Sequence, residues 1–168
     1  MKKIFEKRDD ATILNRMTGE RCIIVCFSNI KELFNTYYEI LGDDLFSLEY
    51  ERGYRIGKLR LQKFRTSNDP KKLVDKLLEI YEYMGAFKVI EWNFDPVRLE
   101  GKVLIKNSYM AEIFQGLGKT VCHNIAGYLA AIIEGAFKSD VMVKETKCLA
   151  QGDDLCVFEI RGRKPVIC

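Results

Sequence analysis

Three cysteines in the last third of the chain constrain its fold more than any other feature. Cys148 and Cys156 flank a seven-residue connection that contains the turn-forming residues Gly152, Asp153 and Asp154. The two thiols should therefore face each other across the base of a β-hairpin. The third, Cys122, opens a long apolar stretch of helical periodicity, where a helix dipole favours a thiolate.

The carboxylate of Glu145 lies three residues before Cys148 and suggests a metal site. Three thiolates and one carboxylate can complete a closed, tetrahedral zinc site that ties the helix to the hairpin. Three buried thiols packed as small apolar groups, or a disulfide, are alternatives that the spacing leaves open. On a regular strand Glu145 and Cys148 point to opposite faces, so a bulge must turn one of them, or Glu145 only supports the ligands.

The histidine that follows Cys122 has several possible roles. Two consecutive helical residues are about 100° apart, which makes it awkward for Cys122 and His123 to bind one metal. His123 is therefore a candidate for a hydrogen bond to a ligand, a structural histidine, or a fourth metal ligand in place of Glu145.

Periodicity and turn residues predict an α+β fold with an antiparallel sheet packed on helices. A strand is expected over Arg21–Phe27 (RCIIVCF), followed by helices near 28–42, 43–64, 68–85 and 120–137. Further strands are expected near 87–94, 102–107, 140–148 and 155–161, the last two forming the closing hairpin. The proline of Asn68-Asp69-Pro70 suits the first turn of the third helix.

Small residues interrupt otherwise apolar helix faces. Gly53 and Gly57 lie on the apolar stripe of the second helix, where each costs about 1 kcal/mol relative to alanine. They permit either close helix packing or space for a ligand. If a ligand is bound, the candidate lining residues are His123, Gly53, Gly57, Tyr50, Phe46, Trp92 and Tyr128.

Composition limits the possible classes of protein. The net charge of +3 comes from interspersed lysine and glutamate, so direct nucleic-acid binding is not expected. We expect no membrane span, because the chain has no run of about eighteen apolar residues. The charged start MKKIFEKRDD lacks the apolar core of a secretory signal, and we expect a cytoplasmic protein of one domain, 1–168.

The C-terminal part resembles the 4-vinyl reductase domain family. GKTVCHNIAGYLAAIIEGAF (118–137) and VMVKETKCLAQGDDLCVFEI (141–160) carry its Cys-His pair, Gly-Tyr-Leu helix, Glu-x-x-Cys, Gly-Asp turn and Cys-x-Phe. The resemblance extends over about 20–165. It implies the ligand-binding fold shared by nitric-oxide-signalling and transport-particle proteins.

The resemblance also implies a function and a metal. Phenol-sensing relatives hold zinc with three cysteines and a glutamate at this order and spacing, which implies Cys122, Glu145, Cys148 and Cys156 here. Such a closed site is structural rather than catalytic. The implied function is a sensor or binding domain for an apolar or aromatic small molecule, acting as a homodimer. A tetrapyrrole vinyl-group reductase component and a structural assembly subunit are the alternatives, although no nicotinamide or flavin motif is visible.

Overall fold

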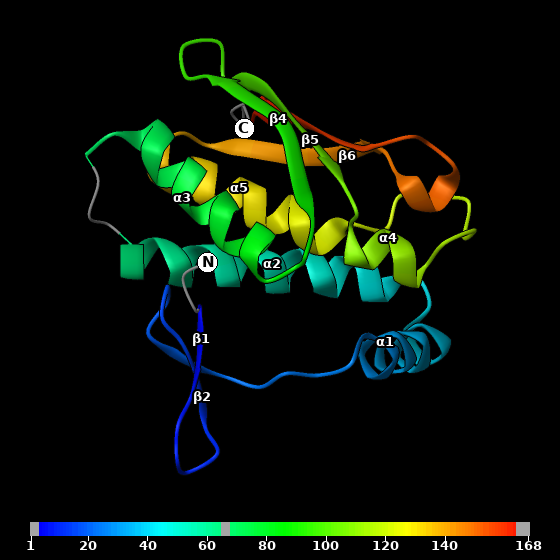
Figure 1. Cartoon of the computed structure of the whole chain (residues 1–168). Helices are drawn as coiled ribbons and strands as arrows, with labels where there is room; N and C mark the ends of the chain where they lie inside the picture. Colours follow the sequence, from blue (N-terminus) through cyan, green and yellow to red (C-terminus); the bar gives the residue numbers. More distant parts are fainter. Residues whose placement is uncertain (1–3, 65–67, 164–168) are drawn as a thin grey trace.

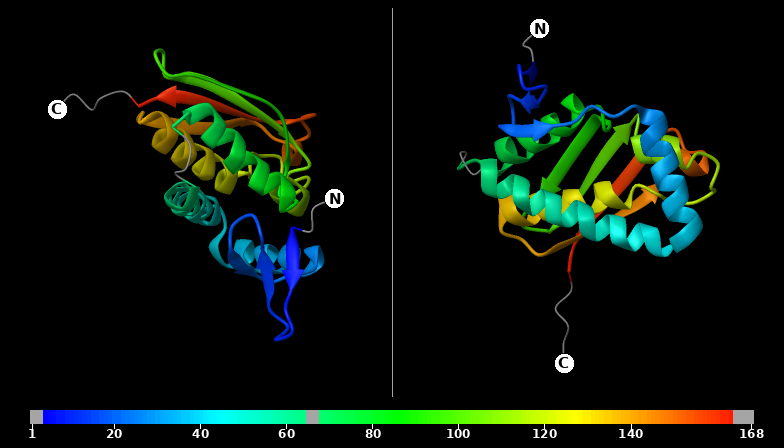
Figure 2. Two further views of the ribbon diagram at one scale, coloured as in Figure 1. Left: turned by 60° about the vertical axis from the view of Figure 1, so that its left-hand side comes forward. Right: turned by 90° about the horizontal axis from the view of Figure 1, so that it is seen from below.

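The computed structural model describes residues 4–64 and 68–163, and it arranges them in layers (Figures 1 and 2). A four-stranded antiparallel sheet covers helices α3 and α5, and α2 packs on the opposite side of α5. The helices are α1 Phe27–Leu41, α2 Asp44–Phe64, α3 Pro70–Tyr83, α4 Tyr109–Ile113 and α5 His123–Phe137, with a 3-10 turn at Leu149–Gln151. The strands are β1 Phe5–Lys7, β2 Ile13–Asn15, β3 Glu20–Cys22, β4 Lys88–Asp95, β5 Glu100–Lys106, β6 Val141–Lys147 and β7 Cys156–Gly162.

The larger sheet has the strand order β4-β5-β7-β6, with every neighbouring pair antiparallel. Its register aligns Val103, Phe158 and Glu145 in one row across β5, β7 and β6. Because directly opposite residues of a ladder point to the same face, the carboxylate of Glu145 faces the core with its two apolar neighbours. All three side chains are buried.

Helix α5 is the central element of the core. Its residues from Asn124 to Ile133 are all buried, as expected for a helix that is apolar on nearly every side and packed between two layers. The closing hairpin β6–β7 packs on one side of α5 and α2 on the other.

Glycines bring α2 and α5 into backbone contact. A Cβ atom on Gly53 would lie 1.9 Å from the carbonyl oxygen of Asn124, and one on Gly127 would lie 2.0 Å from that of Tyr50. A Cβ on Gly57 would lie 2.6 Å from the Cβ of Ala131. The space that a ligand was expected to use beside Gly53 and Gly57 is therefore filled by α5, and we treat both glycines as packing residues.

Most of the predicted elements are confirmed, including the four long helices and the strands of the larger sheet. Helix α3 begins as expected, with the side chain of Asp69 accepting hydrogen bonds from the backbone N–H groups of Lys71 and Lys72. The strand predicted over Arg21–Phe27 is wrong in extent. Strand β3 ends at Cys22, because no other strand of the described chain lies beside Ile23–Cys26.

The first part of the described chain forms an arm on the far side of α2 from the larger sheet (Figure 2). It consists of the small sheet β1-β2-β3 and helix α1, joined by the extended segment Ile23–Cys26. The hairpin β1–β2 was not predicted from the sequence. None of the helices in residues 4–64 and 68–163 is both long and apolar enough to cross a membrane.

Candidate metal centre and the adjoining pocket

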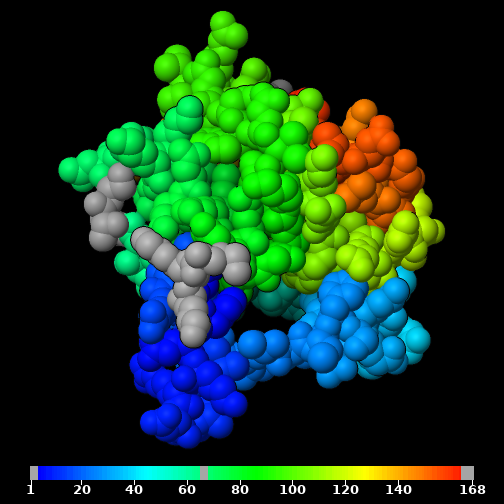
Figure 3. Space-filling model, in the orientation of Figure 1, coloured from blue at the N-terminus to red at the C-terminus, as the bar shows by residue number. Residues whose placement is uncertain are grey.

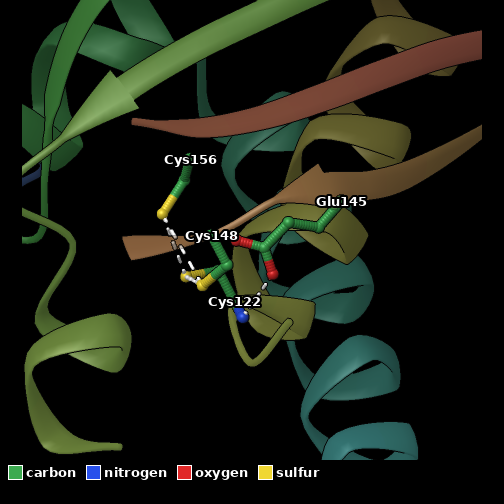
Figure 4. A group of neighbouring side chains, drawn as sticks. All are labelled: Cys122, Glu145, Cys148 and Cys156. Carbon is green, nitrogen blue, oxygen red and sulfur yellow. Dashed lines mark hydrogen bonds between the residues drawn. The ribbon is translucent and has the colours of Figure 1, made fainter. Parts of the chain in front are cut away.

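Three structural elements bring the sulfurs of Cys122, Cys148 and Cys156 together (Figure 4). Cys122 is the N-cap of α5, Cys148 follows β6 at the start of the 3-10 turn, and Cys156 begins β7. The Sγ–Sγ distances are 3.8 Å for Cys122–Cys148, 3.7 Å for Cys122–Cys156 and 3.8 Å for Cys148–Cys156. These separations exclude a disulfide in this structure, since an S–S bond is about 2.05 Å long.

A bulge in β6 adds Glu145 to the group. The β6–β7 register shifts between Glu145 and Lys147, so one extra residue separates Glu145 from Cys148 along the strand. Both side chains consequently face the core, which resolves the conflict expected on a regular strand. One carboxylate oxygen, Oε2, accepts a hydrogen bond of 2.8 Å from the backbone N–H of Cys122.

The donor atoms have the geometry of a metal site. Sulfurs at the corners of a tetrahedron, each about 2.3 Å from a central zinc, would be about 3.8 Å apart, as the three observed pairs are. The ligand atoms of the four residues all lie within 4.8 Å of one another. The second carboxylate oxygen of Glu145, Oε1, is buried without a hydrogen-bond partner among the described residues, and a metal would satisfy it. The cluster could therefore hold a metal ion.

Neighbouring groups orient these ligands. The Ser108 hydroxyl lies 3.1 Å from the Cys122 sulfur, and the Leu149 backbone N–H donates to the Cys156 sulfur over 3.4 Å. Asp153 Oδ2 accepts a hydrogen bond of 2.8 Å from the Cys148 backbone N–H. The role of Asp153 could have been found from its place in the predicted turn, whereas no local sequence signal pairs Ser108 with Cys122.

Burial changes the acidity of the cluster in the absence of metal. Burial and the nearby Cys148 raise the pKa of Glu145 to about 8, and burial raises the pKa of Cys122 well above its ordinary value. Hydrogen bonds from Cys122 and Cys156 lower the pKa of Cys148. The Cys122 contact favours the Cys156 thiolate, but the hydrogen bond to Cys148 and burial outweigh it and raise the pKa of Cys156. Near neutral pH the metal-free cluster thus carries about one negative charge.

A pocket of about 510 Å³ opens beside Glu145. It lies between α2, the start of α5 and β6, and it is lined by Tyr50, Thr120, His123, Ala126, Met142, Val143, Lys144, Glu145 and Arg163. Hollows of about 430 and 540 Å³ elsewhere on the surface are lined mainly by charged side chains of the larger sheet and α3. The first pocket combines apolar walls with a few polar groups, as small-molecule sites do.

Two of the predicted ligand residues line this pocket, and a third is adjacent. Tyr50 and His123 line it, and the His123 ring stacks on Phe46 with centroids 5.3 Å apart. Burial lowers the pKa of His123, so its imidazole is neutral at pH 7. This ring lies outside the cysteine and glutamate cluster, which leaves Glu145 as the fourth member.

Trp92 and Tyr128 lie elsewhere. Trp92 Nε1 donates to Asp75 over 2.7 Å at the contact between β4 and α3. The Tyr128 hydroxyl donates to the Leu77 carbonyl over 3.0 Å, deep in the core. We therefore leave both out of the proposed pocket.

Comparison with known proteins identifies the family. The family model of the 4-vinyl reductase domain matches residues 102–162. An uncharacterised protein of Methanocaldococcus jannaschii, MJ1460, is 32% identical over 146 residues, which cover 82% of this chain and 74% of the relative. The chain belongs to the 4-vinyl reductase domain family. This confirms the resemblance that the sequence motifs indicated.

Solved structures confirm the fold class of this family member. The phenol-responsive sensory domain of the transcription activator PoxR, solved with phenol, aligns with a TM-score of 0.67 at 14% identity, over 95% of this chain and 85% of that one. An H-NOX protein from S. oneidensis aligns with a TM-score of 0.59 at 12% identity, over 84% of this chain and 78% of that one. The expected likeness to transport-particle proteins stays a prediction.

Proposed function

We propose that this member of the 4-vinyl reductase domain family is a binding domain for an apolar or aromatic small molecule, built around a structural zinc site. The observation that carries the proposal is the tetrahedral spacing of the three sulfurs together with the unpartnered oxygen of Glu145. Zinc is the ion that a Cys₃ set with one carboxylate suits best among common metals. Four protein ligands would leave no open position, so the metal would fix the fold rather than perform chemistry.

The pocket supports the ligand part of the proposal. Glu145 belongs both to the metal cluster and to the pocket wall, so the β6 strand would be held rigid beside a bound molecule. The neutral His123 offers one hydrogen bond to a hydroxyl or similar group, whereas Ala126 and Val143 supply apolar walls. The fold of the phenol-responsive PoxR domain is consistent with this use. We propose that the chain acts as one unit in binding.

Zinc binding should release about three protons per ion at pH 7. The reason is that Glu145, Cys122 and Cys156 hold protons in the metal-free cluster, and each must lose one to become a ligand. Calorimetric titration of metal-free protein in two buffers of different ionisation enthalpy measures the number. The Glu145→Gln variant should release about one proton fewer. Equal release by both proteins would remove Glu145 from the ligand set.

Filling the pocket should abolish ligand binding without unfolding the protein. The Ala126→Phe variant places a ring in the space between α5 and β6, and we expect it to weaken binding of phenol or indole by about tenfold or more. Binding is measured by calorimetry, after a thermal-shift screen of small aromatic compounds on the wild type. Ser47→Phe is the matched control, because Ser47 is exposed on α2 outside the pocket. An equal affinity of wild type and Ala126→Phe would place the ligand elsewhere.

A further inference from the structure

The segment that joins β3 to α1 exposes apolar side chains to solvent. Ile23 and Ile24 are 77% and 73% exposed, and Val25 is 40% exposed. This segment follows β3, which is an edge strand in the order β1-β2-β3. Among the described residues, Ile23, Ile24 and Val25 form no backbone hydrogen bond to another strand. An extended edge of this kind is a template for pairing with another strand.

Both ends of the segment are anchored to the rest of the molecule. On one side, Glu20 forms ion pairs with Arg60 and Lys63 of α2. On the other, the Phe34 ring of α1 packs edge-on against the Tyr109 and Phe114 rings, each with centroids 6.4 Å apart. Figure 3 shows the blue segment crossing an open gap between these two contacts. Because it is already held extended, pairing would cost little conformational entropy.

The sequence of the segment, Cys-Ile-Ile-Val-Cys over 22–26, reads similarly in both directions. Two copies paired antiparallel about a two-fold axis at Ile24 would place Ile24 opposite Ile24. The same register places Ile23 opposite Val25 and Cys22 opposite Cys26. Directly opposite residues share a face of the ladder, so every pair matches side chains of the same character.

Helix α1 provides further apolar surface on the same side of the molecule. Leu33, Tyr37 and Ile40 recur at helical spacing and are 43%, 43% and 73% exposed. They lie, like the segment, on the side of α2 opposite the larger sheet (Figure 2). With the segment, they expose on the order of 600 Å² of side-chain surface per chain, comparable to the roughly 800 Å² per partner of a standard interface. Such a patch is larger than a monomer usually leaves in water.

We propose that two copies of this chain form a dimer by antiparallel pairing of residues 22–26 about Ile24, with the exposed face of α1 covered by the partner. The small sheet then continues across the two-fold axis. This inference is independent of the metal site and of the pocket.

The mass in solution tests the proposal. Sedimentation of the zinc-loaded wild type should give twice the 19.5 kDa of one chain. Ile24→Asp places two like charges opposite each other and should weaken the dimer by about a hundredfold or more. Val97→Asp is the matched control, because Val97 is 90% exposed at the β4–β5 turn, and it should remain a dimer. A wild type that stays monomeric as its concentration is raised, or a dimer unaffected by Ile24→Asp, would overturn the proposal.

Cross-linking tests the register. In a Cys22→Ser, Cys26→Ser, Cys168→Ser background, Ile24→Cys should give a covalent dimer with a short bismaleimide, whereas Val97→Cys should not. The remaining cysteines are buried in the metal cluster. Failure of Ile24→Cys to cross-link in a protein that sediments as a dimer would refute pairing about Ile24.

Discussion

Cys156→Ser is expected to abolish stoichiometric zinc binding and to lower the free energy of unfolding by about 4 kcal/mol or more. The sulfur of Cys156 lies 3.7 Å from that of Cys122 and 3.8 Å from that of Cys148, so its loss opens the proposed site. A site that is absent from the unfolded chain contributes its binding free energy to folding, about 10–16 kcal/mol in zinc-finger peptides. Elemental analysis and urea denaturation measure the two effects.

A matched control separates the metal from the loss of a thiol. Cys22 is half-exposed and lies in the arm, outside the cluster, so Cys22→Ser should keep one zinc per chain and nearly all of the stability. Addition of a strong chelator to the wild type should reproduce the destabilisation of Cys156→Ser. Equal loss of zinc in the two serine variants would show that the ligand set is wrong.

Gly53→Ala is expected to destabilise the protein by about 3 kcal/mol or more. Its new methyl group would lie 1.9 Å from the carbonyl oxygen of Asn124, a backbone atom that can move only if α5 moves away from α2. Intrinsic helix propensity alone predicts the opposite sign, a gain of about 1 kcal/mol for alanine over glycine. The sign of the change, measured by urea denaturation of zinc-loaded protein, therefore decides between packing and propensity.

Ser47→Ala is the control for this substitution, since Ser47 is exposed on the same helix. It should change stability by no more than about 0.5 kcal/mol. Gly127→Ala should behave like Gly53→Ala, because its methyl group would lie 2.0 Å from the Tyr50 carbonyl oxygen. A stabilised Gly53→Ala variant would mean that α2 and α5 are not in backbone contact.

Local patterns were sufficient for the larger elements and for the cysteines of the cluster. Helical periodicity and Asp69-Pro70 locate the long helices, and the Gly-Asp turn locates the closing hairpin. The place of Glu145 needed more, because the bulge that turns it inward is set by pairing with β7 and not by the residues of β6 alone. Only the family resemblance favoured it in advance.

The arm and the glycines show what a local pattern cannot supply. Arg21–Phe27 has strong β propensity, but a strand also needs a neighbour, and the chain gives Ile23–Cys26 none among its described residues. Gly53 and Gly57 were compatible with a cavity or with close packing. The choice depended on where α5 lies, and that helix comes much further along the chain.

X-ray absorption at the zinc edge, on protein purified without added metal, tests the central claim most directly. The proposed site predicts one zinc per chain with three sulfur neighbours at about 2.3 Å and one oxygen at about 2.0–2.2 Å. The Glu145→Gln variant should lose or lengthen the oxygen contact and keep the three sulfurs. Protein that folds with its thiols free and without zinc, or a spectrum with fewer than three sulfur neighbours, would contradict the account.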